Sequence, residues 1–444
     1  MRLLQCTANQ DQDIIQVSLT EYASSQIPPY AILSHRWRDE EVEYQHMTSD
    51  VDYKNMRGYP KIEQCARAAL EYGIHHIWVD TCCINKSSSA ELSEAINSMY
   101  LWYNDSLICF AFLDDVSYER GKLDFTQVRT SSWFTRGWTL QELIAPKTMV
   151  FYSKEWSKLG SRIDLANTIS VASGIDIKIL QNTRHLDSAS VSEKMSWAAT
   201  RETTRIEDVA YSLMGLFSVS MPTLYGEGSR AFRRLQLEIM QSTNDHTLFA
   251  WEDTTCNGDM LASSPRQFKD CHVFQPISYP EFISRFGIHE PKPDFSMTNA
   301  GLHIQLPMLT NPTEKSPDSF IAFLACVRVD PVNRIFARIF LERTDDQKFS
   351  GFHRVVKYGH TIEAHFNPTS SNVATQTIWI SPKRVRVAAR REEEYIPSRV
   401  ITMDAKPSKR DSWQMVEGFV GNLRRRSTMR LGIGSARRRA GGAS

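Results

Sequence analysis

The residues whose spacing points most directly to chemistry are Trp138 and Glu142. They lie four apart in a segment of helical pattern that Pro146 ends, so they share one face of a predicted helix. A carboxylate beside an indole is partly desolvated, which raises its pKa, and it can hold a ribose hydroxyl or stabilise an oxocarbenium ion as in glycoside cleavage. The spacing alone favours a plainer alternative, in which Glu142 pairs with Arg136 or Lys147 at the surface.

Further polar side chains follow three apolar segments that have the length and composition of strands. The first segment, 30–34, ends on Ser34 and is followed by His35, Arg36 and Trp37. The second, 76–80, ends on Asp80 and is followed by Thr81, Cys82, Cys83 and Asn85. The third, 107–113, is followed by Asp114 and Asp115. Ligands of open parallel sheets bind beyond the carboxyl ends of the strands, which predicts a binding site here. Arg36 beside Ser34 suits a phosphate because guanidinium offers fixed donors, and Trp37 offers a stacking face. Alternatively, Asp80 and Asn85 only shape a turn, and Arg36 pairs with Asp39 or Asp114.

The elements that must position these residues alternate between apolar strands and amphipathic helices. Helical patterns cover 61–72, 91–103 and 138–145, and a fourth strand is predicted at 148–152. Strands that are apolar throughout and alternate with such helices indicate an α/β domain with a parallel sheet covered on both faces.

The rest of the chain divides by composition into three parts after an α/β domain over 1–158. We expect a helical region over 159–251, a β-rich region over 252–410 and a basic, disordered tail over 411–444. In the helical region, Thr204 to Glu207 fits a capping box that opens a helix with Ile206 facing inward. A second amphipathic helix is predicted at 229–241.

Composition excludes several classes of protein. The net charge of +1 gives no global field toward nucleic acid, and no apolar stretch is long enough to span a bilayer. The start of the chain does not fit a signal peptide, and the eight cysteines form no C-x-x-C pair. We therefore expect a cytoplasmic protein with reduced thiols, without a membrane segment and without a metal site.

Three segments resemble the three motifs of the fungal heterokaryon incompatibility (HET) domain. They are YAILSHRW at 30–37, WVDTCCINK at 78–86 and WFTRGWTLQELIAP at 133–146. The stretch from 195 to 251 resembles the helical region that often follows such domains, so the resemblance covers about residues 1–251. It implies a filamentous fungus and a role in nonself recognition, or vegetative incompatibility, that ends in programmed cell death.

HET domains are in turn distantly similar to TIR domains, which have a flavodoxin-like parallel sheet. Ser34, Arg36, Asp80, Trp138 and Glu142 stand where the TIR pattern has Ser and Arg, Asp, and Trp with Glu. Enzymatic TIR domains cleave NAD at the nicotinamide–ribose bond, and the resemblance implies that Glu142 is the catalytic residue. The chain departs from the pattern by a Trp in place of Gly after the first-strand Arg, and by a Thr in place of Cys after the helix Trp.

Two main hypotheses follow, and both stay open. In the first, the protein hydrolyses NAD, which is a substrate and not a cofactor; Ser34 and Arg36 hold phosphate, and Trp37 or Trp138 packs a ring. In the second, it is a non-catalytic module that signals by self-association or through a NOD-like or other HET-pathway partner. A third and weaker reading has the arginine-rich tail bind nucleic acid.

Four residues of the helical region are candidates for a lid over the α/β site: Trp197, Arg201, Asp208 and Tyr225. The alternative that they pack and cap a helical bundle is favoured.

Overall fold

The computed structural model describes nine stretches of the chain. They are residues 1–8, 15–119, 121–252, 259–288, 294–310, 316–329, 334–346, 349–355 and 374–380. The predicted basic tail at 411–444 lies outside the described residues, as does part of the region predicted to be β-rich.

The N-terminal region contains a mixed sheet whose centre is parallel, as the sequence predicts. Its four parallel strands are β3 (Ala31–Ser34), β4 (His76–Trp78), β5 (Ile108–Phe112) and β8 (Met149–Tyr152). They lie in the order β4-β3-β5-β8, so the chain moves first to one side of β3 and then to the other. The ends of β3 and β5 flank the point where this direction reverses, which is where open α/β sheets bind ligands.

Three antiparallel strands, which the sequence analysis did not predict, extend this sheet. β1 (Arg2–Ala8) and β2 (Ile15–Glu21) form a hairpin beside β4, and β9 (Lys158–Ser161) pairs with β8. The sheet therefore has seven strands and is only partly parallel. The edge strand β2 begins with an alternation of buried and exposed residues, as expected for an edge with one solvated face.

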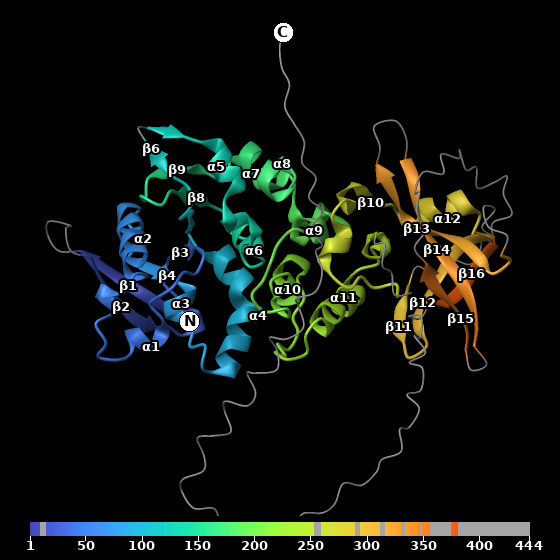
Figure 1. Ribbon diagram of the computed structural model, residues 1–444, viewed down its shortest axis with the longest axis horizontal. Coiled ribbons are helices and arrows are strands. Elements are labelled where there is room, and N and C mark those ends of the chain that lie inside the picture. Colours follow the sequence, from blue (N-terminus) through green and yellow to red (C-terminus); the bar gives the residue numbers. More distant parts are fainter. Residues whose placement is uncertain are drawn as a thin grey trace, which may run out of the picture. The chain divides into compact units, whose positions relative to one another are not determined.

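Helices cover both faces of the sheet. α2 (Tyr59–Glu71) connects β3 to β4, whereas α4 (Ser89–Asp105) and α6 (Thr139–Ile144) lie in the connections that run the other way. Right-handed crossovers then put α2 on one face and α4 and α6 on the other, as Figure 1 shows. Shorter helices complete the region: α1 (Tyr44–Met47), α3 (Asp80–Cys83) and α5 (Phe125–Thr130).

The following region is helical, as predicted, but one of its helices begins later than the sequence suggests. Its helices are α7 (Ala166–Ser173), α8 (Ile177–Leu180), α9 (Val191–Ala198), α10 (Asp208–Tyr211) and α11 (Arg230–Ser242). The predicted capping box at 204–207 is wrong, and Ile206 is 57% exposed instead of facing inward. The reason is that the Glu207 carboxylate accepts hydrogen bonds from the backbone N–H groups of Gly226 and Gly228 and so does not cap its own turn. The prediction for α11 is confirmed.

The C-terminal described residues form a second, largely antiparallel sheet, which confirms the β-rich expectation. Its strands are β10 (Phe274–Pro276), β11 (Ser296–Thr298), β12 (Gly301–Thr310), β13 (Ser319–Val329), β14 (Arg334–Asp346), β15 (Phe349–Val355) and β16 (Ala374–Ile380). The sheet closes on itself because β12 pairs with both β16 and β13. One helix, α12 (Tyr279–Phe286), packs beside it. No helix among the described stretches is both long and apolar enough to cross a membrane.

A close backbone contact joins the α/β region to the helical region. The N–H of Gly137 donates to the carbonyl of Glu202 at 2.8 Å, and the N–H of Glu202 donates to the carbonyl of Thr135 at 2.7 Å. A Cβ atom on Gly137 would lie 2.4 Å from Cγ2 of Thr203. The Thr203 hydroxyl donates to the carbonyl of Arg205 at 2.6 Å, which fixes its rotamer. Glycine is therefore needed at 137 for the two segments to meet.

We expect Gly137→Ala to destabilise the protein by about 1–3 kcal/mol, because the added methyl group overpacks this contact. Thermal and urea unfolding measure the loss. The double variant Gly137→Ala/Thr203→Ser removes the clashing Cγ2 but keeps the hydroxyl, so it should recover most of the lost stability. A double variant no more stable than Gly137→Ala alone would show that this contact does not set the cost.

Candidate functional site

Glu142, a residue of α6, is buried at the centre of the candidate site. Its side chain is 7% exposed, and one carboxylate oxygen accepts a hydrogen bond of 2.5 Å from the hydroxyl of Ser34. Ser34, the last residue of β3, accepts in turn from the indole Nε1 of Trp133 at 3.0 Å. Leu140 and Leu143 of the same helix face the core and hold the carboxylate over the sheet.

This environment raises the pKa of Glu142 to about 7. Burial is the largest cause, since it disfavours the charged form, and the nearby Asp80 carboxylate adds to the shift. The hydrogen bond from Ser34 and the charge of Arg136 act in the opposite direction. The alternative that Glu142 pairs with Arg136 or Lys147 at the surface is wrong, because the carboxylate is buried against Ser34.

The carboxylate opens into a cavity of about 390 Å³. Five of the predicted site residues line it together: His35, Trp37, Asp80, Trp138 and Glu142. The other lining residues are Ile84, Lys86, Leu92, Ile96, Met99, Arg136, Thr204, Arg205, Asp208 and Tyr225. Ser34 lies just beneath, in contact with Glu142.

Asp80, at the start of α3, organises one side of the cavity. One of its oxygens accepts from Nε1 of Trp37 at 2.6 Å, and the other lies 3.7 Å from Nε2 of His35 without a hydrogen-bond partner. Burial, followed by the charges of Lys61, Lys86 and Arg136, holds the pKa of His35 well below its usual value. His35 is therefore neutral at physiological pH.

Two predicted site residues lie elsewhere. Arg36 lines a second cavity of about 350 Å³, which also includes Arg38, Arg57, Lys61 and Trp156. It is Arg38 that forms the two-pronged pair with Asp114.

Asn85 belongs to a turn and does not line the Glu142 cavity. Its side-chain oxygen accepts from the N–H and the hydroxyl of Ser87, and its own N–H donates to Glu91. These bonds order the segment between α3 and α4, which carries Lys86 into the cavity.

The helical region supplies one wall of the Glu142 cavity. Asp208 accepts a hydrogen bond of 2.9 Å from the hydroxyl of Tyr225, and burial raises its pKa. The guanidinium of Arg205 lies 4.3 Å from the centre of the Tyr225 ring. Of the four lid candidates, Asp208 and Tyr225 reach the cavity.

The other two lid candidates pack within the fold. Arg201 is buried and donates to the carbonyls of Arg136 and Trp197 and to the hydroxyl of Thr139. These bonds secure α6 from the side of the helical region.

The sequence analysis missed several residues of the cavity. Lys86 and Arg136 fall within its quoted motifs, so their position beside predicted ligands was the available signal. Arg205 gave no local signal, because long-range contacts, such as those of Gly137 with Glu202 and of Arg201 with Arg136, bring its segment to the site.

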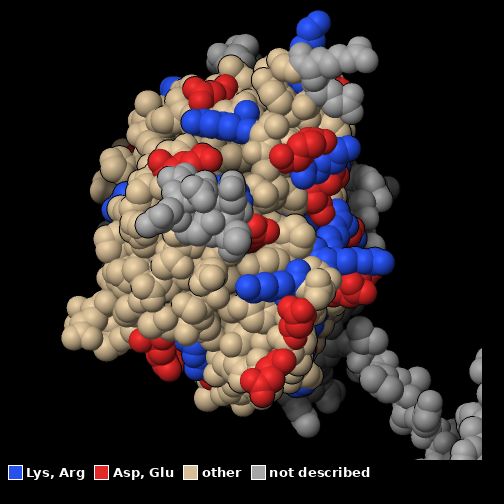
Figure 2. Space-filling view, turned by 90° about the vertical axis from the view of Figure 1, so that its left-hand side faces the viewer, with Lys and Arg blue, Asp and Glu red and all other residues tan. Residues whose placement is uncertain are grey.

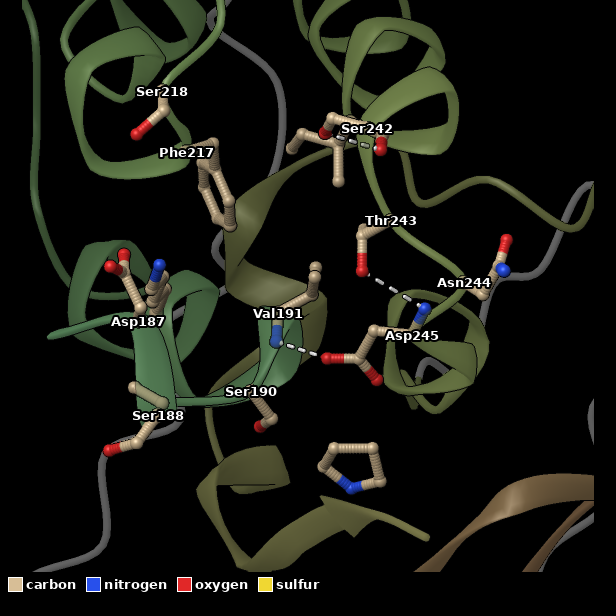
Figure 3. A pocket seen from close by; sticks show the side chains of 14 residues that line it. Asp187, Ser188, Ser190, Val191, Phe217, Ser218, Ser242, Thr243, Asn244 and Asp245 are labelled. Carbon is tan, nitrogen blue, oxygen red and sulfur yellow. Dashed lines mark hydrogen bonds between the residues drawn. The ribbon is translucent and has the colours of Figure 1, made fainter. Parts of the chain in front are cut away.

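A larger cavity, of about 560 Å³, lies within the helical region beyond α9 and α11 (Figure 3). Two of its charged groups serve the fold. Asp245 accepts from the backbone N–H of Val191 at 2.8 Å, and buried Lys194 donates to the carbonyl of Leu216 at 3.1 Å. No predicted site residue lines it.

Metal and disulfide chemistry find no support in the described part of the chain. It holds no group of three or more His, Cys, Asp or Glu side chains suited to a metal ion. Its seven cysteines are free and buried. Burial raises the pKa of Cys82, for example, to about 12, so such thiols are poor nucleophiles.

Comparison with known proteins shows which families parts of this sequence resemble. Residues 30–130 match the family described as heterokaryon incompatibility protein (HET), and residues 230–259 match a domain of unknown function, DUF8212. No solved structure matches the chain. Vegetative incompatibility protein HET-E-1 of Podospora anserina is 42% identical over 254 residues, which cover 55% of this chain but only 18% of that protein. The chain is therefore a HET-domain protein, homologous over part of its length to the Podospora vegetative incompatibility protein.

Proposed function

We propose that this protein acts in vegetative incompatibility and triggers programmed cell death by cleaving NAD at the bond between nicotinamide and ribose. The HET-family match and the Podospora relative support the first part. The second part rests on one observation, the buried Glu142 carboxylate that faces a cavity beyond the ends of parallel strands. The strand order β4-β3-β5-β8 also supports NAD cleavage, because flavodoxin-like sheets, including those of TIR domains, have the same order.

The chemistry asks for a carboxylate that is ionised and poorly solvated. When the C1′–N1 bond breaks, its electron pair goes to the ring nitrogen and neutralises the pyridinium, while positive charge develops on the ribose. Ionised Glu142 would stabilise that charge strongly, because little water competes with it. Water then bonds to C1′ and releases a proton, which gives nicotinamide, ADP-ribose and H⁺.

The burial of Glu142 also costs stability, which is why it supports a functional role. A carboxylate with a raised pKa and no cationic partner in hydrogen-bond contact destabilises the folded state at neutral pH. Such groups cluster at functional sites.

The proposal extends to place and partners. Free, buried cysteines fit a reducing compartment, which we take to be the cytoplasm. By the family resemblance, we propose that activity depends on assembly, either of several copies of this chain or with a NOD-like or other HET-pathway protein.

We expect Glu142→Gln to lower NAD cleavage by about 100-fold or more, since it removes the charge and keeps the shape. Nicotinamide release by purified protein at high concentration, followed by chromatography, measures it. Glu21→Gln, whose side chain is 71% exposed, is the matched control and should cleave like the wild type. Cleavage should rise with pH through about 7, since only the ionised form acts. A folded, assembled wild-type protein that releases no nicotinamide would favour a non-catalytic association module instead.

The same substitution should change how stability depends on pH. Glu142 has a folded pKa of about 7 against 4.5 for the free side chain, so the folded state binds the extra proton between these values. Wild-type stability relative to the Gln variant is therefore greatest below pH 4.5 and is lost as pH rises to about 7, by roughly 3 kcal/mol in total.

Urea unfolding of both proteins at pH 5 and pH 8 measures this difference. Comparing the two proteins at each pH cancels the titration of all other groups. Parallel pH dependence of the two would show that Glu142 keeps an ordinary pKa.

A further inference from the structure

Three positively charged side chains of the Glu142 cavity form no ion pair with any described residue. They are Lys86, Arg136 and Arg205. Nζ of Lys86 is buried without a hydrogen-bond partner and lies 3.5 Å from the centre of the Trp37 ring. On the face of the molecule drawn in Figure 2, by contrast, charges of both signs are interspersed.

The carboxylates of the cavity offset these cations only in part. Arg136 acts to lower the pKa of Glu142 and Arg205 that of Asp208, but the hydrogen bonds of the carboxylates come from neutral groups. Asp80 accepts from Trp37, Glu142 from Ser34 and Asp208 from Tyr225. Burial raises the pKa of Glu142 to about 7, so its negative charge is partly suppressed near neutral pH. The cavity is thus left with positive charge that a bound anion can use.

The rest of the lining is apolar and aromatic. Ile84 and three residues of α4 (Leu92, Ile96 and Met99) supply an aliphatic wall, and the rings of Trp37, Trp138 and Tyr225 supply flat faces. A ligand that fits this lining has both a planar ring and an anionic group, which is the chemistry of a nucleotide.

We infer that Lys86, Arg136 and Arg205 bind the diphosphate of a dinucleotide or of ADP-ribose in this cavity. The inference rests on the proposed function and deepens it, because it assigns the phosphate contacts. It replaces the expectation from sequence that Arg36 and Ser34 hold phosphate, since Arg36 lines the other cavity and the Ser34 hydroxyl is bonded to Glu142. It also makes the helical region part of the binding site through Arg205.

Binding of ADP-ribose, measured by calorimetry at fixed ionic strength, tests the assignment without requiring turnover. Lys86→Gln, Arg136→Gln and Arg205→Gln should each weaken binding about tenfold or more, as expected for a lost charge-assisted hydrogen bond. Nicotinamide riboside, which lacks phosphate, should bind the three variants as it binds the wild type. Arg57→Gln is the matched control, because its side chain is 78% exposed and lines only the second cavity. Thermal unfolding confirms that each variant is folded.

Several outcomes overturn the assignment. It fails if ADP-ribose does not bind the wild type, or if it binds all three variants as tightly as the wild type. It also fails if Arg36→Gln, and not the three variants, abolishes ADP-ribose binding. NAD cleavage with an unchanged KM in the three variants would sink this inference and leave the proposed function standing. If ADP-ribose binding depends on the three cations but the protein does not cleave NAD, the inference stands and the proposed function fails.

Discussion

The hydrogen bond between Ser34 and Glu142 is the interaction around which the candidate site is built. It ties the last residue of the first parallel strand to a helix more than a hundred residues later. Trp133 completes the link by donating to the same hydroxyl. A carboxylate held this way has few ways to relax when its surroundings change, so its charge state responds to what enters the cavity.

The energetic character of the site is a compromise. The fold tolerates a buried carboxylate, a neutral buried histidine and unpaired cations within one cavity, each of which is unfavourable alone. Packing of the surrounding apolar side chains, including the apolar face of α4 and the sheet behind Ser34, offsets this unfavourable free energy. Sites of this kind exchange folding stability for a preorganised electrostatic environment.

Much of this could be predicted from the sequence, but only where local patterns carry the information. The parallel strands, α2 and α4 follow from apolar periodicity, and the position of Glu142 beside Trp138 follows from their spacing on one helix. The hairpin of β1 and β2 was missed because short alternating strands give a weak signal. Residues such as Arg205 were out of reach, since a long-range backbone pairing at Gly137 decides where they lie. Arg36 and Arg38 are two apart, and nothing in the sequence tells which of them will face which cavity.

The backbone pairing between Gly137 and Glu202 has a consequence for how such proteins can exchange parts. The HET match ends at residue 130, and the second family match begins at residue 230. Six lining residues of the cavity fall in the interval between them: Arg136, Trp138, Glu142, Arg205, Asp208 and Tyr225. A recombination event that joined the first matched segment to a foreign partner at its edge would carry over β3, β4 and β5 with the lining from α3 and α4, but would leave Glu142 and the wall from the helical region behind. The stretch of chain that builds this site is therefore longer than the matched HET segment and extends to Tyr225.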